Sequence, residues 1–303
     1  MSTGTLETPS GKTAGDENFP VASFLLPART RPHVAAFYAF ARAIDDIADD
    51  PRLAPEDKVA RLEAFEAAVL DRGSDDPALA KAHRLRASLA ATGVEPRHCR
   101  DLVSAFKQDA TKRRYRDWDE LMDYCDRSAA PVGRYLLDLH GESARCYPAS
   151  DALCRALQVI NHLQDCGDDY RALDRVYLPL AWLDEAGVAV AELAAGRTGP
   201  GLRAVLDRTL DGVDRLIAEA RPLPAQIGHR RLAMDAGAIV GIAERLVRAL
   251  RRRDPLAERV ELSRGAFLVC CLTGVWRGLR PRVPPGADGP RRSKRRSRKL
   301  KNR

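Results

Sequence analysis

Apolar residues recur at helical spacing along most of the chain. In residues 33–50, HVAAFYAFARAIDDIADD, and again in residues 151–170, DALCRALQVINHLQDCGDDY, they return every three or four positions, as on one face of an α-helix. The same pattern covers residues 50–73, 77–93, 95–115, 118–141, 201–220, 232–254 and 263–279. No alternating β-rich run and no linker interrupts this series. The pattern predicts an all-α fold in a single domain, with a loop around RVYLP at residues 175–179.

Both ends of the chain differ from this body. Residues 1–17 are polar and predict a flexible leader, so the helical domain is expected to span residues 18–280. The net charge of +8 is concentrated at the other end, because residues 276–303 hold twelve Lys or Arg and one Asp, a net of +11. Prolines and glycines precede the basic run. We therefore expect residues 281–303 to be a disordered basic tail on a mildly acidic body.

Several classes of protein are disfavoured by what the chain lacks. The leader has no apolar segment of the kind found in signal peptides, and the longest apolar run, AFLVCCLTGVW, is too short to span a bilayer. Seven scattered cysteines without a CxxC pair indicate neither a zinc site nor a disulfide framework, so a reducing cytoplasm is the expected location. No GxGxxG fingerprint is present, and no nicotinamide cofactor is expected.

An acidic cluster closes the first predicted helix. Asp45 and Asp49 lie one helical turn apart, as do Asp46 and Asp50. Each like-charge pair at this spacing destabilises an isolated helix by a few tenths of a kcal/mol, and the helix dipole also disfavours anions at a C-terminus. A bound cation would offset both effects. The alternative is a solvated acidic helix end before Pro51.

A second set of oxygen ligands follows an apolar stripe at residues 153–160. Asn161, Asp165 and Asp169 recur every four residues and share a helix face, while Gly167 is expected to interrupt that helix. Alone, this spacing also fits an ordinary amphipathic helix. Two such helices facing each other across a bundle could hold Mg²⁺ ions with a diphosphate between them.

These segments resemble the squalene/phytoene synthase family from about residue 18 to residue 279. SFLLP, YAFARAIDDIADD, YCDRSAAPVG and QVINHLQDCGDDYRALDRVYLP occur in the family's order. The resemblance implies a class I isoprenoid synthase helical bundle with a central apolar cavity, a prenyl diphosphate substrate and Mg²⁺ as cofactor. It also implies that the SAAPVG segment is a small-residue break where a helix bends beside the hydrocarbon tunnel.

The resemblance assigns roles position by position. Asp45 and Asp49 match the first aspartate-rich motif, Asn161, Asp165 and Asp169 match the second metal motif, and Arg42 stands where the family has a diphosphate-binding arginine. The remaining matches are to positions that line the family's substrate site: Ser23, Phe24, Tyr38, Tyr124 and Gln158.

One departure from the common family pattern indicates a branch. Most members carry an arginine immediately before the first aspartate of the second motif, whereas this chain reads NHLQD, with His162 and Gln164. NHLQD and ENFPVAS resemble the hydroxysqualene synthase branch of bacterial hopanoid pathways. That branch ionises presqualene diphosphate and captures the rearranged cation with water. The alternative within the family is condensation of two farnesyl diphosphates to presqualene diphosphate or squalene.

His162 and Gln164 flank the expected Mg²⁺–diphosphate site, and we expect them to help select water as the terminating nucleophile. A neutral histidine can accept a proton, and glutamine can both donate to and accept from water. The alternative is a structural role for both residues: Gln164 replaces an arginine that is no longer needed, and His162 packs against a neighbouring helix.

Other function classes and partners follow from the same residues. A more distant alternative is an all-helical, Mg²⁺-dependent nucleotide pyrophosphohydrolase, which would lack the apolar tunnel. Nucleic acid is not expected as a partner. The basic tail favours peripheral docking on anionic membrane at its inner face, where lipid substrate and product reside, or serves only solubility. Other hopanoid-pathway enzymes are the expected working partners.

Overall fold

The computed structural model describes residues 26–71 and 76–278, and the regular elements of those residues are helices. The predicted leader 1–17, the predicted tail 281–303 and the two candidate residues Ser23 and Phe24 lie outside the described residues. The α-helices are α1 (Arg31–Asp49), α2 (Pro55–Val69), α3 (Ala80–Thr92), α4 (Arg97–Asp109), α5 (Trp118–Ser128), α6 (Ala130–Leu139), α7 (Tyr147–Gln164), α8 (Cys166–Leu173), α9 (Leu180–Glu185), α10 (Pro200–Ala220), α11 (Leu223–Gln226), α12 (Arg230–Arg252) and α13 (Arg264–Gly278). Three short 3₁₀ helices complete the set: η1 (Pro77–Leu79), η2 (Ala144–Cys146) and η3 (Val190–Ala194).

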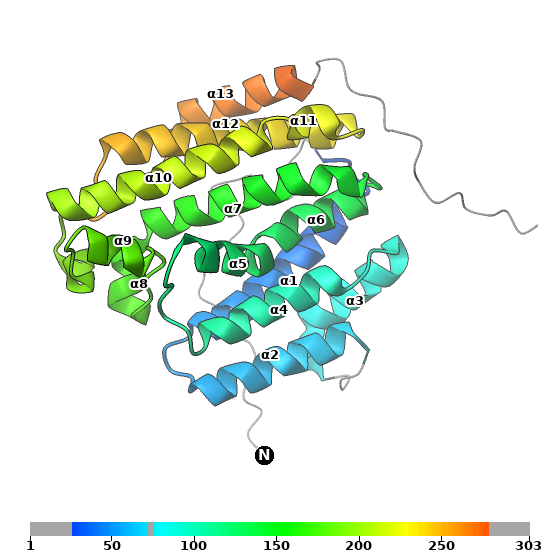
Figure 1. The fold of residues 1–303 in the computed structure, drawn as a ribbon. Helices are drawn as coiled ribbons and strands as arrows, with labels where there is room; N and C mark the ends of the chain where they lie inside the picture. Colours follow the sequence, from blue (N-terminus) through cyan, green and yellow to red (C-terminus); the bar gives the residue numbers. More distant parts are fainter. Residues whose placement is uncertain (1–25, 72–75, 279–303) are drawn as a thin grey trace, which may run out of the picture.

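The helices form two packed groups with separate apolar cores. Helices α1 to α4 enclose one core around Phe40, Phe65 and Leu102, all nearly or fully buried. A larger core lies among α7, α10 and α12, where Ile160 and Ile242 are fully buried. Figure 1 shows α7 running through the middle of the molecule, with α10, α12 and α13 on one side and α1 to α4 on the other. The all-α, single-bundle prediction is confirmed.

The segment SAAPVG breaks a predicted helix into α5 and α6, as the family resemblance implies. Ala129 leaves helical geometry, with φ −124° and ψ −48°, and α6 begins at the next residue. Gly133 allows α6 to approach α7 closely, because a Cβ atom there would lie 2.3 Å from the side-chain oxygen of Ser150. Both residues line the cavity described below, so the small side chains shape its wall.

The predicted helix over residues 151–170 is also two helices, and the prediction of Gly167 as the breaking residue is wrong. The break lies at Asp165, with φ −104° and ψ 7°, between α7 and α8. Gly167 is inside α8, where a Cβ atom would lie 2.9 Å from Leu256. Glycine at this position therefore allows close packing against the chain after α12, where a larger residue would displace the Leu256 side chain. Two short helices, α9 and η3, follow the RVYLP loop and were not predicted.

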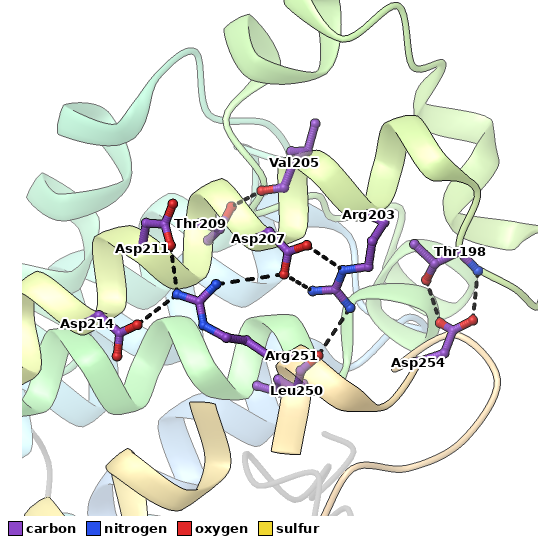
Figure 2. A network of polar contacts seen from close by, with 10 residues as sticks. All are labelled: Thr198, Arg203, Val205, Asp207, Thr209, Asp211, Asp214, Leu250, Arg251 and Asp254. Atoms are coloured by element: carbon purple, nitrogen blue, oxygen red, sulfur yellow. Dashed lines mark hydrogen bonds and ion pairs between the residues drawn. The ribbon is translucent and has the colours of Figure 1, made fainter. Parts of the chain in front are cut away.

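Ion pairs and hydrogen bonds join α10 to the C-terminal end of α12 (Figure 2). Arg251 donates to Asp211 and Asp214 of α10, at 2.7 Å each. Just beyond the helix, Asp254 accepts a hydrogen bond of 2.9 Å from the backbone N–H of Thr198. These contacts fix the segment that follows α12, which in turn lies against the end of α7.

Helix α13 packs on α12 at very short range. A Cβ atom at Gly274 would lie 2.3 Å from the backbone nitrogen of Ala238, so the two backbones are nearly in contact. Cys270, one turn earlier on the same face, is fully buried. By contrast, a Cβ atom at Gly265 meets nothing within 4 Å.

We expect Gly274→Ala to destabilise the protein by about 1–3 kcal/mol, because backbone atoms rather than flexible side chains must move. The matched change Gly265→Ala, at the open start of the same helix, should be neutral or slightly stabilising through helix propensity. Urea denaturation of both variants measures the difference. Equal stability of the two variants would contradict the close packing of α13 on α12.

Candidate active site

A mostly apolar cavity of about 240 Å³ lies between α1 on one side and α6, α7 and α12 on the other. Its walls are formed by aliphatic and aromatic side chains, among them Val34, Phe37, Leu136, Leu153, Leu157 and Ile239. At one end stand polar groups from the two helices singled out in the sequence. They are Tyr38, Arg42 and Asp45 of α1 with Gln158 and Asn161 of α7. The cavity thus combines apolar walls with a group of polar residues from α1 and α7.

The acidic end of α1 is held by arginine. Arg42 forms an ion pair of 3.0 Å with Asp45 and donates from Nε to Asp46 at 2.9 Å. Burial disfavours the charged form of Arg42, but Asp45 and Asp46 outweigh this effect and raise its pKa. The pKa of Asp45 is raised well above its usual value by burial and by the neighbouring Asp49, with Arg42 opposing. The repulsion between the two carboxylates at this spacing would be relieved by a bound cation.

Asp49 is paired with Arg175, which follows α8. The Arg175 guanidinium donates to Asp49, to the carbonyl oxygen of Ala48 at 3.0 Å and to that of Asp109 at 3.1 Å. The Arg175 side chain is only 7% exposed. Its pKa is raised because Asp49 and its other anionic neighbours outweigh the effect of burial. One buried cation therefore joins α1, α4 and the segment after α8.

The second predicted ligand set spans the break between α7 and α8. The backbone N–H of Asp165 donates to the Asn161 carbonyl at 3.0 Å, and the N–H of Asp169 donates to the Asp165 carbonyl at 2.8 Å. The one-turn spacing of the three residues is kept across the break. Of the three, Asn161 lines the cavity, whereas Asp165 and Asp169 are not among its lining residues.

The donor set at this end is suited to a hard divalent cation. Carboxylate and amide oxygens come from α1 and from the α7–α8 junction, and Asp49 crowds Asp45. Within residues 26–71 and 76–278, no three His, Cys, Asp or Glu side chains already converge as a metal site. The residues fit a site that is completed by a bound diphosphate, since Mg²⁺ usually shares its shell with substrate phosphates.

Behind the polar end lies a buried aromatic cluster. The ring of His162 stacks on Tyr177 with centroids 3.5 Å apart, and Tyr124 lies 6.1 Å from the same histidine. Tyr124 donates a 2.7 Å hydrogen bond to Asp109. Burial raises the pKa of Asp109 to about 7, although Arg175 and the Tyr124 hydrogen bond oppose the shift. Tyr124 and His162 are thus not among the residues that line the cavity.

His162 is held neutral. Burial and the nearby charge of Arg175 lower its pKa to about 3, and its Nε2 atom has no hydrogen-bond partner among the described residues. Gln164 faces elsewhere: its side-chain amide donates to the carbonyl oxygen of Val260, in the segment after α12. His162 therefore stands next to Asn161 of the polar end, whereas Gln164 attaches α7 to the segment after α12.

Sequence reasoning missed three residues of this region, Asp109, Arg175 and Tyr177. Arg175 and Tyr177 stand in the RVYLP segment, which the sequence predicts as a loop and as part of the family resemblance, without a role for either residue. Asp109 ends α4 without any neighbouring motif. The contacts of Arg175 join segments more than 60 residues apart, as in its hydrogen bond to the Asp109 carbonyl, and helical periodicity does not report such contacts.

Solved structures of isoprenoid synthases share this fold. A squalene synthase, HpnC, from Alicyclobacillus acidocaldarius superposes with a TM-score of 0.68 at 32% identity, over 79% of this chain and 90% of that one. A dehydrosqualene synthase superposes with a TM-score of 0.73 over 85% of this chain and 90% of that one, at 21% identity, which shows the fold alone.

Sequence comparison gives the family. The squalene/phytoene synthase family model matches residues 12–266. Hydroxysqualene synthase of Rhodopseudomonas palustris is 48% identical over 87% of this chain and 89% of its own length. Hydroxysqualene synthase of Sinorhizobium fredii is 44% identical over 82% and 84%. The chain belongs to the squalene/phytoene synthase family.

We expect Arg175→Met to lower the free energy of unfolding by about 3 kcal/mol, because it leaves Asp49 and two carbonyl groups without their cation. The matched control is Arg171→Met, which removes an exposed ion pair with Asp168 and should cost less than about 1 kcal/mol. Denaturant titration compares the two. Similar losses in both variants would show that the buried pair does not hold these helices together.

The buried neutral histidine predicts a loss of stability in acid. The unfolded chain takes up a proton at His162 below about pH 6.5, whereas the folded protein does not do so until about pH 3. His162 therefore does not lower the free energy of unfolding above pH 6.5. Below that pH it lowers the free energy of unfolding increasingly, by about 2 kcal/mol at pH 5. Relative to the wild type, His162→Phe should gain stability between pH 7.5 and pH 5 in urea titrations. A constant difference between the two proteins would contradict a neutral buried His162.

Proposed function

We propose that this protein is a hydroxysqualene synthase, which converts presqualene diphosphate and water to hydroxysqualene and diphosphate. The observation that carries the proposal is the apolar cavity with Arg42, Asp45 and Asn161 at one end. It matches an amphiphilic substrate with a long hydrocarbon part and an anionic head. The names of the two relatives above favour this member of the family over condensation of two farnesyl diphosphates.

We propose Mg²⁺ as the cofactor, held by Asp45 and Asp49 from α1 and by Asn161, Asp165 and Asp169 from the α7–α8 junction. When bound, the metal neutralises the charge that develops on the departing diphosphate. This oxygen-only donor set is of the kind that Mg²⁺ prefers.

The protein's own groups bind and orient the substrate around that centre. Arg42 already reaches the carboxylates of α1 and can donate charge-assisted hydrogen bonds to diphosphate oxygens. Tyr38 and Gln158 border the same end and can bind the head group, and Ser23 and Phe24 are proposed for this region from the family pattern alone. The aliphatic walls exclude bulk water, which would otherwise quench a carbocation early.

The remaining sequence predictions concern residues behind this end. Tyr124 acts on the site through Asp109, to which it donates, so we propose a positioning part for it. His162 stays neutral, and we propose that its unpartnered Nε2 atom holds a water molecule by a hydrogen bond rather than taking its proton. The contact of Gln164 with Val260 favours the structural alternative for that residue.

The direct test is incubation of the purified protein with presqualene diphosphate and Mg²⁺, followed by identification of the lipid product. We expect hydroxysqualene, with one oxygen from H₂¹⁸O when the reaction is run in labelled water. Parallel incubations with farnesyl diphosphate and with nucleoside triphosphates separate the alternatives. Turnover of farnesyl diphosphate to presqualene diphosphate, or release of diphosphate from nucleotides, would reject the proposal.

We expect Asp45→Asn and Asp165→Asn each to reduce turnover of presqualene diphosphate by about 10²-fold or more, because each removes a charge from the metal shell. The matched control is Asp168→Asn, which alters an exposed carboxylate of α8 paired with Arg171 and should leave turnover near normal. Circular dichroism checks that the helical content is unchanged. Near-normal activity of both Asp45→Asn and Asp165→Asn would rule out the proposed metal site.

We also propose peripheral docking on anionic membrane, supported by α13 and the basic sequence after it. None of the described helices is long and apolar enough to cross a bilayer. On α13, Leu268, Leu272 and Trp276 are 59%, 62% and 62% exposed and recur one turn apart, opposite the face that packs on α12. A helix that is apolar on both faces suits a membrane surface better than water. In such a setting the protein would work beside other enzymes of hopanoid synthesis.

Truncation after Arg280 should weaken binding to vesicles that contain phosphatidylglycerol, because each Lys or Arg near an anionic surface contributes about 1 kcal/mol. Leu272→Glu in the full chain should weaken it independently by removing apolar area. Sedimentation with vesicles at low salt measures both, with phosphatidylcholine vesicles as the control. Unchanged sedimentation of both variants would reject the docking surface.

A further inference from the structure

A second carboxylate lines the cavity away from the candidate metal ligands. Asp235 lies on α12, in the second turn, and is only 3% exposed. Its neighbours along the cavity wall are Leu232, Ala236 and Ile239, all apolar. Among the described lining residues, Asp45 and Asp235 are the two carboxylates. Under the proposed function, Asp45 binds metal at the head group, whereas Asp235 has no part in binding the head group.

The position of Asp235 follows from how α12 runs beside α7. The backbone N–H groups of Gly228 and His229, before α12, donate to Glu142, which precedes α7. At the other end, Val260 after α12 accepts from Gln164, the last residue of α7. The two helices therefore run in the same direction.

The separation of Asp235 from Asn161, at the metal end of the cavity, follows from their positions along the two helices. Asp235 is five residues into α12, and Asn161 is fourteen residues into α7. Since Glu142 joins the two helix starts, the difference of nine residues corresponds to roughly 14 Å along the helix axes. Side chains, metal ions and diphosphate extend into this interval. Under the proposed function, the carboxylate would therefore lie beside the hydrocarbon part of the substrate rather than beside its head group.

A buried carboxylate is unsuited to binding either a hydrocarbon chain or a diphosphate anion. It is suited to a reaction in which positive charge develops on carbon inside the cavity, because it stabilises that charge. It can also accept a proton from water as the water attacks.

The cavity also contains a hydroxyl group that fits a polar guest. Ser128, at the end of α5, lines the cavity and is 7% exposed. Its oxygen has no hydrogen-bond partner among residues 26–71 and 76–278. Buried hydroxyl groups are normally hydrogen-bonded, so a molecule with a donor or acceptor is expected beside Ser128 when the cavity is occupied. Water is such a molecule, and this reaction consumes one.

We propose that Asp235 is a catalytic residue that holds the attacking water and takes its proton, an inference that rests on the proposed function. The carbon–oxygen bond of presqualene diphosphate breaks, and its electron pair leaves with the diphosphate. The carbocation rearranges, and the water oxygen forms the new carbon–oxygen bond of hydroxysqualene. One proton passes from that water to the Asp235 carboxylate and later to solvent, so that atoms and charge balance.

The test compares Asp235→Asn with the wild type in turnover of presqualene diphosphate and Mg²⁺, with diphosphate release and lipid products measured in the same samples. Asparagine keeps the size of the side chain but cannot take the proton. We expect diphosphate release to stay within about threefold of the wild type, while the share of hydroxysqualene in the product falls by about tenfold or more. Oxygen-free hydrocarbons from the same cation should replace it.

Two further variants make the result specific. Asp235→Glu restores a carboxylate and should recover part of the hydroxylated product. Glu244→Gln makes the same kind of change outside the cavity, where Glu244 binds Arg221, and should match the wild type. Urea denaturation checks that each variant is folded at the assay temperature.

Two outcomes would overturn the inference while leaving the proposed function in place. One is an unchanged share of hydroxysqualene in Asp235→Asn. The other is an equal loss of diphosphate release and hydroxysqualene, which would assign Asp235 to ionisation or folding. If the wild type itself forms no hydroxysqualene from presqualene diphosphate, the proposed function fails and the inference fails with it.

Discussion

The repulsion among carboxylates at the end of α1 is the constraint on which the site depends. Asp45 and Asp49 lie one turn apart at a helix C-terminus, where both their mutual repulsion and the helix dipole are unfavourable. Two arginines compensate: Arg42 pairs with Asp45 within α1, and Arg175 pairs with Asp49 across the fold. Because Arg175 also binds the Asp109 carbonyl, compensation of charge and the docking of α1 on α4 depend on the same side chain.

This arrangement leaves the protein prepared for a cation and an anion together. Metal ions can bind the carboxylates that pair with the arginines. A diphosphate can bind the arginines that pair with the carboxylates. The apolar cavity then begins directly beside the charged end, since Asp45 and Asn161 belong to its lining. Under the proposed function, ionisation and the protection of the resulting carbocation would therefore take place in adjoining parts of one space.

Periodicity and residue type predicted much of the fold. The order of the helices, the break at Ala129 and the meeting of α1 with α7 at Asp45 and Asn161 all follow from local patterns and from the family resemblance. The helices and their order depend on residues three or four apart, which is the range that periodicity reports, whereas the meeting of α1 with α7 follows from the family resemblance. The break lies at Asp165 and not at Gly167, because glycine at position 167 allows close packing on Leu256 inside α8 and does not end a helix.

The rest of the site could not be predicted because it depends on distant pairs. Arg175 receives its role from Asp49, which lies 126 residues earlier, and Gln164 is fixed by Val260, which lies 96 residues later. Asp235 stands in an ordinary amphipathic helix and becomes notable only because its side of α12 borders the cavity. Such residues carry no local signal, since their neighbours in sequence are not their neighbours in space.

The most direct test of the account is a crystal structure of the protein with Mg²⁺ and a non-ionisable analogue of presqualene diphosphate. We expect metal ions to be bound by Asp45 and Asp49 on one side and by Asn161, Asp165 and Asp169 on the other. The diphosphate should lie between them, and the hydrocarbon should fill the cavity between α1, α7 and α12. Metal or diphosphate bound elsewhere, or a hydrocarbon outside that cavity, would contradict it.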